Sequence, residues 1–136
     1  MAKKHGSVMD FSQQRDADLM RVYRRQLREA KFILMPDIFA RVAASPASRF
    51  WVSEERAAVE MSRMLAGRPG PRMRPNKREM FAEIFRRFLI ERERRPCLSI
   101  LEIVSRIVHQ PAPRFYLTPR TVGELIYRFK KSHTKP

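Results

Sequence analysis

The chain contains two versions of one motif, PASRFWVS at residues 46–53 and PAPRFYLT at residues 111–118. The copies are 65 residues apart, and this offset aligns residues 38–53 with residues 103–118. Six of these sixteen pairs are identical, namely Ile38/Ile103, Arg41/Arg106, Pro46/Pro111, Ala47/Ala112, Arg49/Arg114 and Phe50/Phe115. A match that recurs at a fixed offset indicates an internal duplication of a unit of roughly 65 residues.

Each copy of the repeat predicts three helices. In the first copy, a helix is expected from Asp10 or Ser12 up to Pro36, with Ile33 and Leu34 on its apolar face. The periodic apolar residues predict burial along that whole stretch, and the proline ends it because it cannot continue a helix.

The second copy repeats this order with clearer helix signals. Asn76 followed by Glu79 is typical of a capping box, and Pro96 ends the helix that starts there. Short second helices are expected at residues 36–44 and 100–109, the latter preceded by another capping signal, Ser99 and Glu102.

The third helix of each copy follows the motif. Ser53 and Thr118 are the expected N-caps, and Gly67 closes the first copy. The sequence therefore predicts an all-α protein of two tandem three-helix units, related by duplication and joined by a Pro/Gly/Arg linker. The expected divisions are a flexible basic tail (1–9), a first unit (10–66), the linker (67–76), a second unit (77–131) and a C-terminal tail (132–136).

Composition limits the classes of function. Hydrophobic residues make up 43% of the chain, which favours a folded core over disorder. The single cysteine, Cys97, allows no intrachain disulfide, and the three histidines are scattered. We expect no metal site, no cofactor and no membrane span, and we expect a cytoplasmic protein.

The net charge of +15 is carried mostly by arginine, with 22 Arg and 7 Lys. Residues 1–9 and 10–66 each have a net charge of +2, whereas residues 67–78 have +5 and residues 79–136 have +6. Because a guanidinium group matches phosphate geometry, this excess indicates a nucleic-acid partner.

The order of elements in residues 38–64 and 103–129 is a helix, a turn with proline, and a helix capped by Ser or Thr. This order resembles the helix-turn-helix class of DNA-binding proteins. The resemblance implies DNA as the partner and the third helix of each unit as the element that reads sequence. The turn here has about eight residues, against three or four in that class.

Two readings remain open for the motif side chains. Arg49 and Arg114 lie just before a helix N-terminus, where they can complete a phosphate clamp. Alternatively, they bind nearby carbonyl groups or lie across the adjacent aromatic residue. The aromatic pairs Phe50/Trp51 and Phe115/Tyr116 can likewise stack on bases or belong to the core.

The linker arginines form the strongest candidate for contact with phosphates, because a basic arm can follow a nucleic-acid backbone. The other repeated arginines could line one face or simply be solvated. The complete expected nucleic-acid-binding set is Arg41, Arg49, Arg63, Arg68, Arg72, Arg74, Lys77, Arg78, Arg106, Arg114, Arg120 and Arg128.

No residue pattern suggests catalysis, since the chain has no Gly-rich phosphate loop, nucleophile elbow or acid–base pair. The sequence therefore predicts a non-enzymatic nucleic-acid-binding protein, with DNA favoured over RNA. The rival hypothesis is an adaptor whose basic face meets an acidic protein, with Trp51 and Tyr116 as anchors.

Overall fold

The structure is a computed structural model that describes residues 2–133, and for residues 2–10 it describes the backbone alone. The described part is all-helical, which confirms the expected fold class. Its helices are α1 (Ala2–Glu29), α2 (Met35–Ala44), α3 (Glu54–Leu65), α4 (Pro75–Arg94), α5 (Ile100–Val108) and α6 (Pro119–His133).

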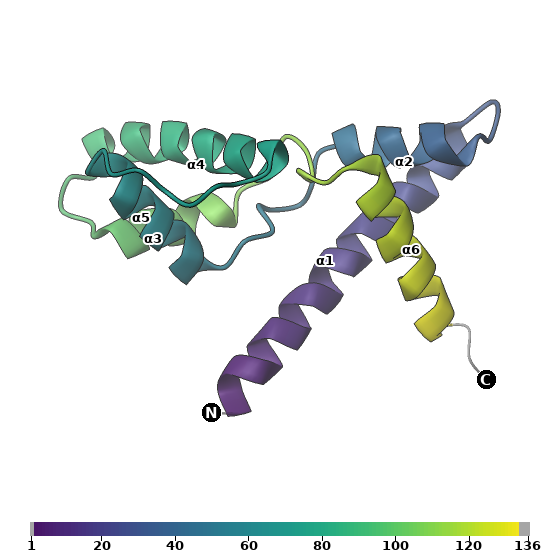
Figure 1. The fold of residues 1–136 in the computed structure, drawn as a ribbon, viewed down its shortest axis with the longest axis horizontal. Coiled ribbons are helices and arrows are strands. Elements are labelled where there is room, and N and C mark those ends of the chain that lie inside the picture. The colour runs from purple at the N-terminus through teal and green to yellow at the C-terminus, as the bar shows by residue number, and fades with distance from the viewer. Residues whose placement is uncertain (1, 134–136) are drawn as a thin grey trace. The chain divides into compact units, whose positions relative to one another are not determined.

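The helices are grouped into two compact units that differ from the expected tandem arrangement. Unit 1 comprises Met1–Ala47 and Pro113–Pro136, with α1, α2 and α6. Unit 2 comprises Ser48–Ala112, with α3, α4 and α5. In Figure 1, α6 lies beside α1 and α2, and α3 lies beside α4 and α5. Each third helix therefore packs in the unit formed by the first two helices of the other half.

This exchange corrects two expectations. The sequential divisions 10–66 and 77–131 are not the groups of helices that pack together. The Pro/Gly/Arg linker does not join two units either, because residues 67–74 connect α3 to α4 inside unit 2. The physical reason lies after α2, where Ser45 is already extended (φ −80°, ψ 151°) and Pro46 prevents a further helical turn. The chain is thereby led away from α2.

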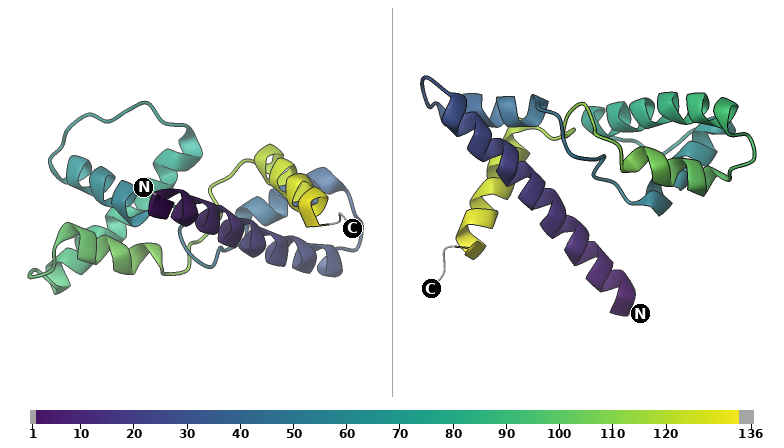
Figure 2. Two further views of the ribbon diagram at one scale, coloured as in Figure 1. Left: turned by 90° about the horizontal axis from the view of Figure 1, so that it is seen from below. Right: turned by 180° about the vertical axis from the view of Figure 1, so that it is seen from behind.

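The core of unit 1 lies between the apolar faces of its three helices. Val22 of α1, Val42 of α2 and Val122 of α6 are each fully buried. The backbone N–H of Phe115 donates to the carbonyl of Ala43 at 3.3 Å and fixes the segment before α6 to the end of α2. Figure 2 shows the N-terminal half of α1 extending beyond this core.

Unit 2 has an apolar core of the same kind. Phe50, Ile84 and Phe88 are fully buried. The backbone N–H of Phe50 donates to the carbonyl of Val108 at 3.0 Å. This bond is the counterpart, 65 residues earlier, of the bond from Phe115 in unit 1.

The helix ends confirm several expected caps. Ser99 forms a complete capping box with Glu102 at the start of α5. The hydroxyls of Ser53 and Thr118 each accept a backbone N–H three residues on, at 3.1 Å. Gly67 follows α3 with φ 69°, a left-handed conformation that glycine adopts without steric cost.

Three expected boundaries were wrong. The tail predicted at residues 1–9 lies within α1 from Ala2 onward. That helix ends at Glu29, so Ile33 and Leu34 are 60% and 62% exposed rather than buried. Helix α4 begins at Pro75, which favours the first helical position, so the expected cap Asn76 lies inside its first turn.

The helix bounds show the same 65-residue offset as the sequence pairs. Helices α2 and α5 begin at residues 35 and 100, and α3 and α6 begin at residues 54 and 119. An ion pair also recurs, since Arg21 contacts Asp18 at 2.8 Å and Arg86 contacts Glu83 at 2.7 Å.

Within the described residues, no helix is both long enough and apolar enough to cross a bilayer.

Candidate nucleic-acid interface

The most cationic segment of the chain is residues 67–78, which we call the basic strap. It leaves the end of α3, crosses to α4 and includes the first turn of that helix. It contains no acidic residue. Its five cationic side chains are all exposed: Arg68, Arg72, Arg74, Lys77 and Arg78. All five belong to the nucleic-acid-binding set that the sequence predicts.

The strap is held to unit 2 by Arg63. The Nη1 group of Arg63 donates to the carbonyl of Arg68 at 2.8 Å, and its Nη2 lies 2.9 Å from the carboxylate of Glu60. Glu60 is only 3% exposed. The guanidinium of Arg63 lies directly against Gly70, where a Cβ atom would displace it. Arg63, an expected phosphate contact, is used to position the strap.

The start of α4 adds to the positive potential of the strap. Its N-cap, Arg74, makes no side-chain capping hydrogen bond, and the first turn contains no acidic residue. The backbone N–H groups of a helix N-terminus carry partial positive charge. The dipole of this 20-residue helix therefore has the same sign as the neighbouring side chains.

Arg49 is bound within its own segment. Its Nε donates to the carbonyl of Phe50 and its Nη2 to the carbonyl of Val52, both at 3.0 Å. Its guanidinium carbon lies 5.1 Å from the centre of the Trp51 ring. Burial lowers the pKa of Arg49, and the charge of Glu54 partly opposes that shift. This geometry favours a structural role over a phosphate clamp.

The second copy shows the same stacking, because Arg114 lies 5.1 Å from the centre of the Tyr116 ring. Phe50 and Phe115 belong to the core, at 0% and 5% exposure. Trp51 and Tyr116 are half-buried beneath the arginines. The ring faces proposed for base stacking or protein anchoring are thus already in contact with a guanidinium.

The remaining expected residues are divided between the two units. Arg41 lies in the last turn of α2 in unit 1, whereas Arg106, its counterpart 65 residues on, lies in the last turn of α5 in unit 2, and both are exposed. Arg120 and Arg128 lie on α6 in unit 1. Arg120 is 3.8 Å from Glu124, and Arg128 is exposed beside the groove described next.

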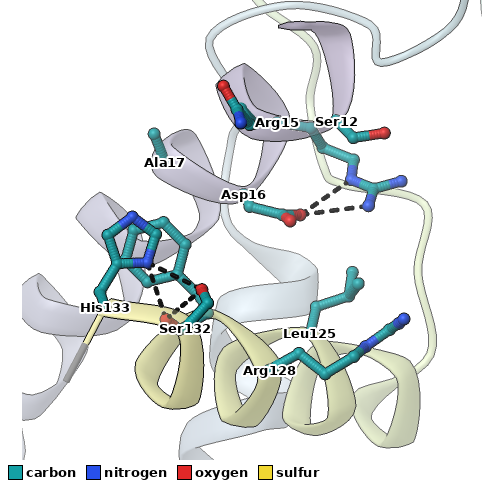
Figure 3. Close-up of a pocket in the computed structure, with 10 residues that line it drawn as sticks. Ser12, Arg15, Asp16, Ala17, Leu125, Arg128, Ser132 and His133 are labelled. Atoms are coloured by element: carbon teal, nitrogen blue, oxygen red, sulfur yellow. Dashed lines mark hydrogen bonds and ion pairs between the residues drawn. The ribbon is translucent and has the colours of Figure 1, made fainter. Parts of the chain in front are cut away.

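Sequence reasoning missed a groove between α1 and α6, with a volume of about 630 Å³ (Figure 3). Arg15 pairs with Asp16 there at 3.1 Å, and the ring centre of His133 lies 4.0 Å from that of Phe129. The equivalent of Asp16 in unit 2 is Phe81, which is buried. The same position of the repeated pattern is therefore polar in unit 1 and apolar in unit 2. The sequence shows this difference, but only the packing shows that Asp16 lines a groove.

A second feature missed by sequence reasoning links α3 to α5 in unit 2. His109 Nε2 lies 2.8 Å from Glu54 Oε1. This hydrogen bond is the main cause that lowers the pKa of Glu54 below its ordinary value, while partial burial acts in the opposite direction. Within the described residues, no group of three or more His, Cys, Asp or Glu side chains is arranged to hold a metal ion.

Both units are basic. Unit 1 has 15 basic and 6 acidic residues, and unit 2 has 14 and 8, so their net charges are +9 and +6.

No protein-family model, curated protein or solved structure matches the chain. The function must therefore be inferred from the geometry and charge of the chain itself.

Proposed function

We propose that this protein is a non-enzymatic, cytoplasmic nucleic-acid-binding protein whose partner is DNA, with the basic strap as its main phosphate contact. One observation carries the proposal: five exposed cations lie within residues 67–78 and no carboxylate lies among them. Many other arginines of the chain are paired with acids, for example Arg86 with Glu83 and Arg94 with Glu91. The strap cations make no such pair among the described residues, which leaves them available to phosphates.

The strap is also preorganised for binding. A flexible basic arm loses conformational entropy when it binds, which reduces its affinity. Here the two contacts of Arg63 already hold the segment against α3. This arrangement supports phosphate binding with a smaller loss of entropy than a free linker would have.

We further propose that the two halves arose by internal duplication, and that helix pairs assembled from both halves act as helix-turn-helix-like elements. The recurring helix bounds and the paired hydrogen bonds of Phe50 and Phe115 support this view. The pairs are α2 with α6 and α5 with α3, because these helices pack together. Helices α3 and α6 would then be the elements that read sequence.

The proposal is tested by titrating the protein into a fluorescently labelled DNA duplex at several salt concentrations. We expect log affinity to fall linearly with log salt, by roughly 0.9 for each phosphate that is neutralised. Replacing Arg68, Arg72 and Arg74 by Gln should lower that slope by about 2 to 3. An RNA duplex of the same sequence should bind more weakly.

A matched control removes the same charge elsewhere. Its substitutions are Arg86→Gln, Arg94→Gln and Arg95→Gln, which affect arginines that are paired with acids. We expect this variant to keep most of the wild-type slope. Equal slopes for the two triple variants would remove the strap from the mechanism, and absence of duplex binding at low salt would reject the proposed function.

A further inference from the structure

The connection between α1 and α2 in unit 1 exposes four consecutive apolar side chains. The exposed fractions are 85% for Phe32, 60% for Ile33, 62% for Leu34 and 36% for Met35. We call residues 32–35 the apolar loop. It stands at the end of unit 1 where α1 turns into α2 (Figure 1). A cluster of exposed, adjacent apolar residues is uncommon on a soluble surface and marks a contact site.

The fold does not require these residues. The equivalent connection in the other half, residues 97–100, has Cys97 and Ser99 at the positions of Phe32 and Leu34. Ser99 caps α5 with a complete capping box. Leu34 is the N-cap of α2 and makes no capping hydrogen bond. The first half therefore lacks a favourable cap at the position where it exposes leucine.

Charged side chains of both signs flank the apolar loop. Lys31 and Arg41 line one hollow of about 520 Å³ together with Phe32 and Leu34. The carboxylates of Glu29 and Asp37 also line this hollow, so charge is balanced there. The excess comes from the last two turns of α1, where Arg24 and Arg28 are exposed. An anionic partner with an apolar interior complements such a surface.

Base pairs between two phosphate strands have this chemistry. Proteins that kink DNA insert Phe, Ile, Leu, Met or Pro between adjacent base steps while cations contact the phosphates. The apolar loop offers these residue types in one short segment. A lipid bilayer is the alternative anionic partner, but stable anchoring there needs a long amphipathic face or a second membrane signal. Four residues on one loop fit a base step better.

We propose that the apolar loop is a wedge that inserts between stacked base pairs and kinks the bound duplex, with Phe32 and Leu34 as the inserting side chains. This inference rests on the proposed function, since a wedge acts only on a duplex that is already bound. The strap supplies affinity that is independent of sequence. The wedge adds a preference for sites that unstack easily, such as TA steps.

The test uses a duplex of about 20 base pairs with one central TA step and 2-aminopurine beside it, whose fluorescence rises when stacking is lost. Wild-type protein at saturation should raise this fluorescence. The double variant Phe32→Ser/Leu34→Ser should bind with roughly tenfold higher Kd and leave the fluorescence unchanged. A matched control, Leu89→Ser/Ile90→Ser, changes two exposed apolar residues of α4 at 41% and 42% exposure and should behave as wild type.

The strap variant separates this inference from the proposed function. With Arg68, Arg72 and Arg74 replaced by Gln, binding should weaken while saturated complexes still show the fluorescence rise. Salt-dependent binding without any fluorescence change in the wild type would overturn the wedge and leave the function standing. Absence of duplex binding would reject both. Association with phosphatidylserine vesicles that the Phe32→Ser/Leu34→Ser variant loses, with duplex fluorescence unaffected, would assign the loop to a lipid surface.

Discussion

The availability of an arginine in this protein is decided by what lies within reach of its guanidinium. Arg49 and Arg63 belong to the expected binding set, but nearby carbonyls and a buried carboxylate occupy them. Arg72 and Arg74 lie in an acid-free segment and are exposed. The sequence could show that the strap contains no acid. It could not show that Arg63 would fold over onto the carbonyl of Arg68, because that contact depends on the turn at Gly67.

A prediction at the residue scale concerns the missing cap of α2. Leucine is among the poorest N-cap residues, whereas serine accepts a backbone hydrogen bond there. We expect Leu34→Ser to stabilise the protein by about 1 kcal/mol. Thermal denaturation followed by circular dichroism measures the change. The matched substitution Ile33→Ser lies one residue outside the cap and should not stabilise, so an equal gain from both would argue against capping as the cause.

At the scale of elements, the sizes of two side chains are matched where α6 packs on α2. In unit 1, a Cβ on Gly123 of α6 would lie 2.7 Å from the ring of Phe39 on α2. The equivalent residues in unit 2 are Ala58 on α3 and Val104 on α5. In unit 1, the large Phe39 thus lies against glycine. At the equivalent positions of unit 2, the smaller Val104 occurs together with alanine. Glycine inside a helix is otherwise unfavourable.

This complementarity predicts the outcome of a double-mutant cycle. Gly123→Ala alone improves helix propensity by about 1 kcal/mol, but it should still destabilise unit 1, because overpacking costs roughly 1–3 kcal/mol. The additional change Phe39→Val should restore the lost stability. Chemical denaturation of the four proteins in the cycle measures the coupling free energy. Additive effects would show that the two residues do not contact each other.

The contact between Glu54 and His109 makes part of the stability of unit 2 depend on pH. The pKa of Glu54 is lowered in the folded protein, so its contribution is complete above the ordinary value of 4.5 and is lost as pH falls through the lower, folded value. We expect Glu54→Gln to reduce the acid-induced loss of stability. Melting temperatures between pH 6 and pH 3 measure this effect. Glu55→Gln, in the same helical turn, is the control and should leave the pH dependence unchanged.

The elements themselves were largely predictable from sequence, and their partners were not. Ser53, Ser99 and Thr118 cap helices as expected, because a cap depends on residues three or four apart. The end of α1 was missed because Ile33 and Leu34 continue the apolar period beyond Glu29, where the helix stops. Local patterns specify which face is apolar, but not which other apolar face covers it.

At the scale of the whole molecule, the exchange of third helices is the feature that sequence could not supply. Because the halves are similar, α3 could in principle cover either α1 with α2 or α4 with α5, and the sequence pattern is compatible with both. The extended segment after Ser45 carries the chain out of unit 1. Ala57 and Met61 of α3 are consequently buried in unit 2, and Val122 and Ile126 of α6 in unit 1.

The exchange predicts how the chain behaves when it is cut in the strap. A protease site inserted between Pro71 and Arg72 divides the chain into one fragment with α1–α3 and another with α4–α6. We expect the cleaved protein to elute from a size-exclusion column as one species, because each unit needs a helix from both fragments. Separation should require denaturant. The uncleaved protein with the same insertion is the control. Two folded fragments that elute independently would contradict the exchange, since each third helix would then have to pack against its own half.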